Sequence, residues 1–349
     1  MGEKIALIYH NDYLIHTDAG HPERKERLDY IIDKLQGEEV RDEHIIIEPE
    51  KATVEDIALI HDISYIQSIK EACDRNDGFL DMDTYIVPES YEVALRSAGG
   101  ALRCLTEIMK GNYNKAFSIG RPPGHHAERS RAMGFCLFNN IAIAAQAAKE
   151  RYGLERIAII DWDVHHGNGT QHSFEDDNRV LFFSVHQSPA YPGTGNAKEV
   201  GKEKGEGYTI NVPLPGGCGD DDYRYVFNEI VVPVLKEYQP QIIMVSAGQD
   251  AYHKDMLAGM NLTLQGYYDM AYIISELAAE LCDNRVLACM EGGYHLDGQA
   301  NAVISALNGF GHWGLPVIQE NIVPYEGDMV KRKVDDIKKI HKKYWKSLK

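Results

Sequence analysis

Short apolar runs alternate with helical patterns along this chain, and the alternation limits the folds it can adopt. The runs suit buried strands and lie at Ile5–Tyr9, His44–Ile47, Lys115–Ile119, Ile157–Ile160, Val180–Val185, Tyr208–Val212, Ile242–Val245 and Val286–Met290. The helical patterns between them include Glu89–Met109, Asn139–Arg151, Tyr223–Glu237 and Leu264–Cys282. Strands that alternate with helices favour a parallel sheet with helices on both faces. We therefore predict an α/β fold with a mostly parallel eight-stranded sheet.

The composition fits one large globular domain. Of the 349 residues, 44% are hydrophobic and 26% are charged, which suits a substantial core. No repeat or linker interrupts the chain, so we expect a single domain over residues 1–349. No apolar run reaches the roughly 18 residues of a membrane span, and the start of the chain looks like a first strand rather than a signal peptide. The lysine-rich residues from about 328 to 349 predict a solvated surface helix.

Cysteine usage and net charge narrow the location and the partners. The six cysteines form no CxxC pair, which favours reduced core residues and a cytoplasmic protein over a disulfide framework. The net charge of −17 argues against a broad nucleic-acid surface and is compatible with cationic substrates, although such a charge also serves solubility alone. We expect neither nucleic acid nor a membrane as a direct partner. The oligomeric state stays open.

Polar residues directly after the fourth apolar run indicate a metal site. Asp161, Asp163 and His165 are spaced two residues apart, and an extended chain points such side chains the same way. A carboxylate and an imidazole at this spacing can share one zinc ion. Gly167 and Gly169 would then permit a tight turn into a helix. The same side chains could instead bond only to nearby backbone amides, so this segment alone favours a metal site modestly.

Further loops bring chemically active groups to the carboxyl ends of other predicted strands. The groups are His125 and His126, Ser184, Asp250 and Tyr294. Ligands of open α/β sheets bind outside these strand ends, so we expect the groups to meet there. Two acids and one histidine on a metal leave positions for water and substrate, as a catalytic zinc requires. Each group alone also has a structural explanation, such as a plain hydrogen bond or core packing.

The segment His21–Arg27 is predicted to begin a helix. Pro22 suits the first turn, and Glu23 and Glu26 would lie near the positive end of the helix dipole. In this arrangement the charged residues cap the helix and form ion pairs. Alternatively, Arg24 could reach the site from below.

Residues beside the strand-end loops are candidates for a substrate pocket. Asp83 is either a turn residue or an acid that holds substrate backbone amides. Phe135 and Tyr191 are candidate pocket walls, with ordinary core packing as the alternative for Phe135. Gly134 precedes Phe135 in the same loop. Gly293 lies in the loop of Tyr294, where two glycines let the backbone approach a ligand closely.

Seven motifs occur together in this chain, and their order is distinctive. They are HPERKERL, RPPGHHA, GFCLFNN, DWDVHHGNGTQ, YPGTG, SAGQD and EGGY. With them the chain resembles the histone deacetylase and acetylpolyamine amidohydrolase family over roughly Tyr9 to Gly314. The resemblance implies the arginase/deacetylase fold, one catalytic zinc ion and hydrolysis of an N-acyl amide.

The resemblance also implies a role for each candidate residue. It implies that Asp163, His165 and Asp250 bind the zinc ion. His125 and His126 would flank the attacking water, and Tyr294 would polarise the carbonyl. Phe135 and Tyr191 would form the tunnel walls, and a potassium ion would bind beside Asp161 with Ser184. By the resemblance, Asn168 would orient His126, whereas some members have an aspartate at this position. This difference resembles the class II type. A neutral amide stabilises imidazolium less than an anion does, so His126 should be less cationic. The ligand set also admits Fe²⁺.

The expected substrate depends on the pocket rim. Leu257 falls where relatives that act on acetylpolyamines can carry glutamate, and leucine cannot pair with a distal ammonium group. Acyl-lysine in a protein or peptide is therefore favoured, with Asp83 at the rim. An acetylpolyamine or another small N-acyl amine is the alternative.

Two other functions were weighed against this one. A two-manganese ureohydrolase needs further carboxylates beside the last ligand, but Gly248 and Tyr252 flank Asp250 at a distance of two residues. A non-catalytic acyl-binding protein is disfavoured because Tyr294 and all expected ligands are present.

Overall fold

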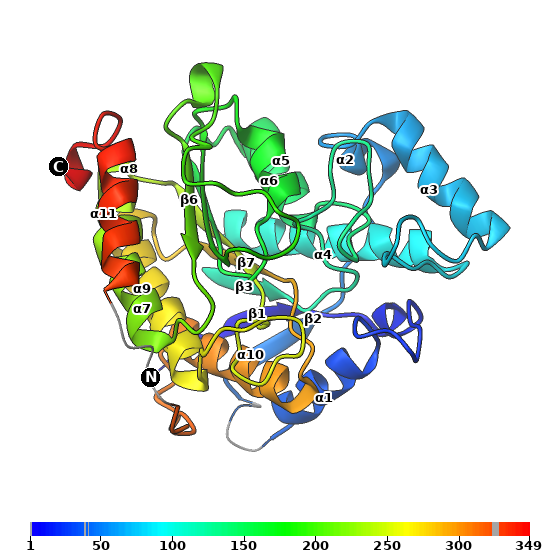
Figure 1. Cartoon of the computed structure of the whole chain (residues 1–349). Helices are drawn as coiled ribbons and strands as arrows, with labels where there is room; N and C mark the ends of the chain where they lie inside the picture. Colours follow the sequence, from blue (N-terminus) through cyan, green and yellow to red (C-terminus); the bar gives the residue numbers. More distant parts are fainter. Residues whose placement is uncertain (1, 38–39, 41, 323–327) are drawn as a thin grey trace.

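Eight strands form one sheet at the centre of the molecule, with helices on both faces (Figure 1). The computed structural model describes residues 2–37, 40, 42–322 and 328–349. The order across the sheet is β2-β1-β3-β8-β7-β4-β5-β6, and every neighbouring pair is parallel. The predicted fold class is confirmed, and the sheet is entirely rather than mostly parallel.

The observed strands lie close to the predicted runs. They are β1 (Ile5–Ile8), β2 (His44–Ile47), β3 (Lys115–Ser118), β4 (Ile157–Asp161), β5 (Val180–Gln187), β6 (Thr209–Leu214), β7 (Ile242–Ala247) and β8 (Val286–Met290). The α-helices are α1 (Glu26–Leu35), α2 (Val54–Ile57), α3 (Ile63–Arg75), α4 (Ser90–Met109), α5 (Asn140–Tyr152), α6 (Asn168–Phe174), α7 (Asp220–Val226), α8 (Val232–Tyr238), α9 (Leu264–Leu281), α10 (Leu296–Gly311) and α11 (Met329–His341). Short 3-10 turns are η1 (Asn11–Leu14), η2 (Glu203–Gly205) and η4 (Lys346–Leu348), and η3 (Phe227–Val231) is a π-helical turn.

Alternate side chains of each strand enter two separate cores. In β4, Ala158 and Ile160 pack into one core, and Ile157 and Ile159 pack into the other. The first core is closed mainly by α1, α7, α8, α9 and α10, and the second by α3, α4 and α5. Because helices cover both faces of the sheet, the strand sequences are continuous apolar runs. All six cysteines are buried and none forms a disulfide.

The predicted helix Tyr223–Glu237 is interrupted in the structure. It begins at Asp220 as α7, passes through the π-helical turn η3 and continues as α8 to Tyr238. Pro233 lies in the first turn of α8 and has no backbone N–H to donate. The missing donor accounts for the departure from regular α-helical bonding over the preceding turn.

The prediction for the start of α1 was wrong. The helix begins at Glu26, and Pro22 lies in a bend before it rather than in its first turn. Glu23 is fully buried and points away from the helix end because it pairs with arginines in the interior. Arg24 does not reach the site: its guanidinium donates to the Ala19 carbonyl and pairs with Glu26.

The C-terminal helix is amphipathic rather than fully solvated, which corrects the prediction for residues 328–349. Helix α11 ends at His341 and lies against β6, an edge strand of the sheet (Figure 1). Val330, Val334 and Ile337 are buried on its inner side, and their spacing of three and four residues forms one helical stripe. Within the described residues, no helix has the length and hydropathy needed to cross a membrane.

Candidate functional site

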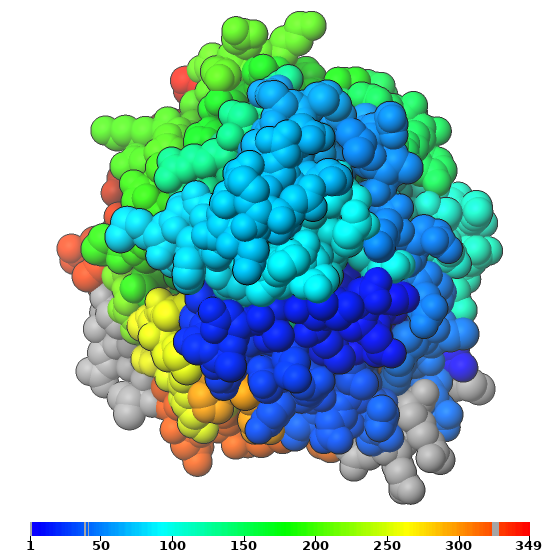
Figure 2. Space-filling view, turned by 90° about the vertical axis from the view of Figure 1, so that its right-hand side faces the viewer, coloured from blue at the N-terminus to red at the C-terminus, as the bar shows by residue number. Residues whose placement is uncertain are grey.

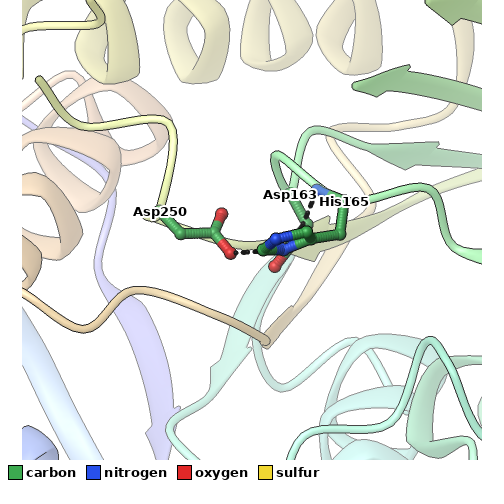
Figure 3. A group of neighbouring side chains, drawn as sticks. All are labelled: Asp163, His165 and Asp250. Carbon is green, nitrogen blue, oxygen red and sulfur yellow. Dashed lines mark hydrogen bonds and ion pairs between the residues drawn. The ribbon is translucent and has the colours of Figure 1, made fainter. Parts of the chain in front are cut away.

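Asp163, His165 and Asp250 meet beyond the carboxyl ends of β4 and β7 (Figure 3). The two strands pair directly, so the loops that follow them emerge side by side. One potential ligand atom from each residue lies within 4.8 Å of the others. His165 Nδ1 is 3.3 Å from Asp163 Oδ1 and 3.1 Å from Asp250 Oδ2. The structure thus brings together the three residues expected to bind one metal ion.

The donor set fits a divalent metal ion. Both carboxylates are buried, with Asp163 1% and Asp250 0% exposed. Burial by itself lowers the pKa of His165, but the hydrogen bonds to Asp163 and Asp250 outweigh burial and raise that pKa to about 10. The two carboxylates therefore favour positive charge at this point. Two carboxylate oxygens and one imidazole nitrogen suit zinc or iron.

Two glycines allow the backbone to close in on these carboxylates. A Cβ at Gly292 would lie 2.3 Å from Asp250 Oδ2, and one at Gly248 would lie 2.1 Å from Asp163 Oδ2. The Gly292 N–H donates to Asp163 Oδ2 at 2.8 Å, and the Val164 N–H donates to Asp250 Oδ1 at 2.9 Å. These backbone donors fix the orientation of both carboxylates.

The reason predicted for Gly167 and Gly169 was wrong. Neither glycine has a positive φ, so the turn into α6 does not require their conformational freedom. A Cβ at Gly167 would instead lie 2.1 Å from Asp161 Oδ2, and one at Gly169 would lie 2.2 Å from the Ala127 carbonyl oxygen. Glycine is needed here because the helix start packs tightly against the loop that carries the paired histidines.

His125 and His126 lie side by side on the loop after β3, with ring centroids 3.9 Å apart. His125 Nδ1 is 2.9 Å from Asp161 Oδ2, and His126 Nδ1 is 2.8 Å from Asn168 Oδ1. Burial favours the neutral form of His125, but Asp163 and Asp161 outweigh it and raise its pKa well above the usual value. One histidine therefore faces a carboxylate and the other an amide.

The pKa of His126 is lowered well below its usual value, first by burial and then by the positive charge of His125 and His165. The direction matches the expectation of a less cationic His126, but burial rather than Asn168 is the largest cause. A cationic His125 beside a neutral His126 gives the pair the two protonation states that acid–base chemistry needs.

Tyr294 lies in the turn that follows β8, and opposite charges hold that turn from two sides. Arg27 donates from Nε to the Gly293 carbonyl at 2.7 Å and from Nη2 to the Glu291 carbonyl at 2.5 Å. Asp255 Oδ2 accepts from the backbone N–H groups of Tyr294 at 2.6 Å and His295 at 3.1 Å. Arg27 thus binds the carbonyl groups of the segment that positions Tyr294, and Asp255 binds its amide groups.

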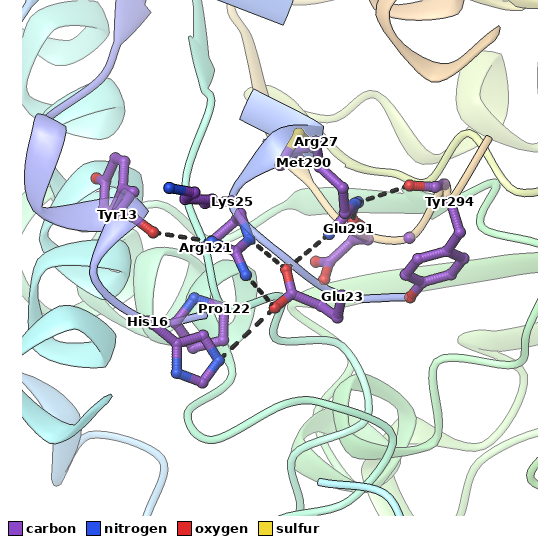
Figure 4. Close-up of polar contacts among 12 residues, drawn as sticks. Tyr13, His16, Glu23, Lys25, Arg27, Arg121, Pro122, Met290, Glu291 and Tyr294 are labelled. Carbon is purple, nitrogen blue, oxygen red and sulfur yellow. Dashed lines mark hydrogen bonds and ion pairs between the residues drawn. The ribbon is translucent and has the colours of Figure 1, made fainter. Parts of the chain in front are cut away.

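A buried ion cluster lies next to this turn (Figure 4). Ion pairs within His21–Arg27 were expected, but their burial and a third member of the cluster were not. Glu23 pairs with Arg27 at 2.9 Å and binds Arg121 through both carboxylate oxygens. All three side chains are fully buried. The four-residue spacing of Glu23 and Arg27 was a usable signal for an ion pair. Nothing local to the sequence indicated Arg121 as the third member.

Segments far apart in sequence enclose the cluster. The Tyr85 hydroxyl donates to the His16 carbonyl at 3.3 Å, and His16 Nδ1 is 2.7 Å from Ser90 Oγ. Figure 2 shows the N-terminal residues, in dark blue, directly against the light blue and cyan segment that includes α3 and α4. These contacts bury the ion cluster between segments far apart in sequence.

The sequence analysis also did not single out Glu291 as a residue of the site. Its carboxylate accepts from the Gly124 N–H at 2.7 Å and from the Ser246 hydroxyl at 3.1 Å. Burial raises the pKa of Glu291 to about 7, although His125 opposes this shift. The acid ties the histidine loop to β7 and to the turn that carries Tyr294.

The expected pocket walls lie next to the histidines and Tyr294. The Tyr191 ring centroid is 5.1 Å from that of His126, and the Phe135 centroid is 5.7 Å from that of Tyr294. Gly134 has a φ of +57°, and a Cβ there would lie 2.4 Å from the His126 ring. Gly134 therefore lets the chain pass close to the histidine while Phe135 and Tyr191 flank the site.

The remaining candidates are Asp83, Leu257 and Gly293. His21 Nε2 is 3.0 Å from the Asp83 carbonyl oxygen, and its ring packs edge-on against Phe135, so the Asp83 loop adjoins the pocket wall. Leu257 is 39% exposed, and its N–H donates to Asp255 at 3.0 Å. A Cβ at Gly293 would meet Gln249 and Gln299, and the substrate contact expected of this glycine stays a prediction.

Asp161 and Ser184, the expected potassium ligands, are neighbours across the sheet. They occupy paired positions, Asp161 at the end of β4 and Ser184 in the middle of β5. Asp161 Oδ1 accepts from the Asp163 N–H at 3.1 Å, and Ser184 Oγ is 3.0 Å from His186 Nδ1. Both side chains are fully buried, and this placement is compatible with a buried cation beside the two paired residues.

Comparison with known proteins places the chain among deacetylases. A family model described as "Histone deacetylase domain" matches residues 21–310. A "Probable deacetylase" from Archaeoglobus fulgidus is 41% identical over 98% of this chain and 99% of its own length. A "Histone deacetylase-like amidohydrolase" from Pseudomonas aeruginosa is 40% identical over 79% of this chain and 73% of its own length. The crystal structure of the HDA15 HD domain superposes with a TM-score of 0.91 at 33% identity, covering 99% of this chain and 96% of that one.

Proposed function

The chain belongs to the histone deacetylase family, and from this premise we propose that it is a zinc-dependent amidohydrolase that removes acetyl or other acyl groups from lysine side chains. The observation that carries the proposal is the convergence of two carboxylates and one imidazole beside a histidine pair of opposite protonation preference. Amide hydrolysis needs an activated water, a proton carrier and a group that stabilises the oxyanion, and this site contains candidates for all three.

Asp163, His165 and Asp250 would hold the metal ion. Zn²⁺, or Fe²⁺ in its place, would supply Lewis acidity for the amide carbonyl and lower the pKa of a water molecule. The backbone N–H groups of Val164 and Gly292 keep the two carboxylates oriented. The open coordination positions would be left to water and substrate.

His126 is the proposed general base and acid. Its Nδ1 faces Asn168 Oδ1, so Nδ1 carries a proton and Nε2 has the free lone pair. Nε2 would accept a proton from the attacking water and pass it to the nitrogen of the leaving amine. His125, held by Asp161, would stay cationic and stabilise the negative charge that develops on the carbonyl oxygen.

Tyr294 would donate its hydroxyl to the same developing oxyanion. The turn that positions it is fixed by Arg27 and Asp255, so little reorganisation is needed during the reaction. Phe135 and Tyr191 would flank the extended acyl-lysine side chain and exclude water. Asp161 and Ser184, with backbone carbonyls, would hold a structural K⁺.

Acyl-lysine in a protein or peptide is the proposed substrate, in an enzyme of the cytoplasm. Leu257 would lie at the rim where an acid would be needed to pair with a distal ammonium group, and Asp83 would accept from substrate backbone amides. Small acetylated amines offer no such amides. The discriminating experiment measures acetate release from an acetyl-lysine peptide and from acetylspermidine, with protein of defined metal content.

The proposal expects the peptide to be the better substrate by kcat/KM, and expects a chelator to abolish activity until Zn²⁺ is restored. Faster turnover of acetylspermidine would shift the assignment to small N-acyl amines. Two bound metal ions per chain would favour a ureohydrolase, although within the described residues a single cluster of potential metal ligands is found. Tight hydroxamate binding without any turnover would favour a non-catalytic binding protein.

A further inference from the structure

Behind the amide that contacts His126 lies a carboxylate that the proposed mechanism does not use. Glu128 Oε1 accepts from Asn168 Nδ2 at 2.5 Å. On its other side, Asn168 Oδ1 is 2.8 Å from His126 Nδ1. A continuous series of hydrogen bonds therefore runs from His126 through Asn168 to Glu128. The Glu128 carboxylate is separated from His126 by one side-chain amide.

The hydrogen-bonding capacity of these groups decides how the amide is oriented. An ionised carboxylate can only accept, so Asn168 must present its NH₂ group to Glu128. Its carbonyl oxygen then faces His126, and that oxygen can only accept. His126 must therefore carry its proton on Nδ1, which leaves Nε2 free to accept a proton. With the amide reversed, the proton would move to Nε2, and the ring could not act as a base toward substrate.

Glu128 is itself held in place from several sides. His172 Nδ1 is 2.8 Å from its Oε1 and 2.9 Å from its Oε2. His172 follows Asn168 by four residues on α6, so both side chains lie on the same face of that helix. The Glu128 carbonyl also accepts from His61 Nδ1 at 2.9 Å, and its N–H donates to the Arg131 carbonyl at 2.9 Å.

We propose that Glu128 is a positioning residue that fixes the side-chain amide of Asn168 and, through it, the tautomer of His126 that can accept a proton. The inference rests on the proposed function, because it concerns the base of that reaction. The His126 carbonyl also accepts from Asn168 Nδ2, at the longer distance of 3.2 Å. Glu128 therefore shares this task, and its loss weakens the base without abolishing it.

The test compares three variants of the full-length, zinc-loaded protein. Glu128→Met removes the acceptor at similar length and should lower kcat about tenfold or more while KM changes less than about twofold, since residues behind a catalytic shell typically matter at this level. Glu128→Gln keeps one carbonyl acceptor and should retain an intermediate kcat. The matched control is Glu175→Met, because Glu175 is 24% exposed against 23% for Glu128 and its side chain pairs with Lys202 at the surface. Its kcat should equal that of the wild type.

A second measurement reads the tautomer directly and needs neither metal nor turnover. The ¹⁵N shifts of labelled histidines in the metal-free protein distinguish Nδ1–H from Nε2–H, and the His126 signals are assigned by their loss in His126→Gln. Wild type should show the Nδ1–H form alone, whereas Glu128→Gln, which can turn either end of its amide to Asn168, should show a measurable share of Nε2–H. If Glu128→Met does not fold, the tautomer measurement on Glu128→Gln tests the proposal instead.

The outcomes separate this inference from the proposed function. A wild-type protein that hydrolyses acyl-lysine, together with unchanged kcat and an unchanged tautomer in the Glu128 variants, overturns the role of Glu128 alone. Changes of kcat and KM in equal measure in Glu128→Met, if Glu175→Met shows the same changes, also overturn it, because they would indicate a general structural effect. A wild-type protein without hydrolytic activity overturns the proposed function, while the tautomer shift would still report the hydrogen-bond series.

Discussion

At the scale of single residues, the chemistry depends on one hydroxyl and on the space around two carboxylates. Tyr294 is buried at 6% exposure, and its pKa lies well above the usual value, first because of burial. It therefore stays protonated across the working pH range and can act only as a hydrogen-bond donor or acceptor. A donor aimed at a developing oxyanion contributes to the rate rather than to binding.

Tyr294→Phe tests this role. Loss of one oxyanion donor costs about 10²–10³-fold in kcat in other enzymes, and we expect a decrease of that order with the metal retained. Steady-state kinetics and metal analysis on the same preparation provide the measurement. Activity equal to that of the wild type would refute the role of the hydroxyl.

Gly292→Ala tests the close approach of backbone to the metal ligands. The added Cβ would lie 2.3 Å from Asp250 Oδ2 and 2.7 Å from Asp163 Oδ2, so at least one carboxylate must move. We expect metal affinity to fall about 10- to 100-fold, as for other changes directly behind a ligand shell. Competition with a chromophoric chelator measures it.

The control for this substitution is Gly216→Ala. The atom nearest its added Cβ is the Gly259 carbonyl oxygen, at 3.4 Å, which is an ordinary contact. Equal metal affinity in the two variants would show that the crowding at Gly292 does not matter.

At the scale of elements, the C-terminal helix shows how an edge strand is protected. Strand β6 ends the sheet on one side, yet all of its residues are buried. The apolar stripe of α11 lies against it, Lys331, Lys333 and Lys339 are exposed, and Lys338 pairs with Glu229 of η3. The helix thus covers a strand edge that would otherwise be free to pair with another chain.

Ile337→Ala should destabilise the protein. Ile337 is 1% exposed, and truncating a buried isoleucine to alanine typically costs about 2–5 kcal/mol. Equilibrium urea unfolding gives the difference in free energy of unfolding. Lys333→Ala, on the exposed side of the same helix, should change it by less than about 0.5 kcal/mol. Similar effects of the two substitutions would mean that α11 is not packed as described.

At the scale of the whole molecule, the cluster of Glu23, Arg27 and Arg121 joins the N-terminal segment to the loop after β3. Burial by itself raises the pKa of Glu23, but Arg121 outweighs burial and lowers that pKa to about 2 from an ordinary value of 4.5. The ionised carboxylate therefore stabilises the folded state fully above the unfolded pKa, and this stabilisation is lost as pH falls from about 4.5 to about 2.

Comparing the wild type with Glu23→Gln isolates this contribution. At neutral pH the variant should be less stable, because two buried guanidinium groups lose their counter-charge. The difference in free energy of unfolding should narrow by about 2 kcal/mol between pH 5 and pH 3, as the wild-type carboxylate takes up its proton in the unfolded state. Urea unfolding at each pH measures it. A difference that does not change with pH would contradict the lowered pKa of Glu23.

The order of elements along the chain was sufficient to predict the architecture and the location of the site. The apolar runs that become β4 and β7 are buried on both faces, so their composition indicates a covered parallel sheet. In such a sheet all carboxyl ends lie at one edge, and polar residues directly after the strands must meet there. On this ground Asp163, His165 and Asp250 could be placed at the same edge of the sheet, and the family resemblance singled them out as the metal ligands.

The supports of the site were decided only by the tertiary structure. Arg27 approaches the Tyr294 turn from the first turn of α1, and Asp255 approaches it from the segment after β7. Arg121 completes the pair of Glu23 and Arg27, and Glu128 reaches Asn168 from the histidine loop. Such hydrogen bonds between segments far apart in sequence depend on distances of a few ångström that local spacing does not encode. The helix start at His21–Arg27 was mispredicted for a related reason: local preference placed Glu23 at a helix end, whereas the distant Arg121, together with Arg27, binds its side chain in the core.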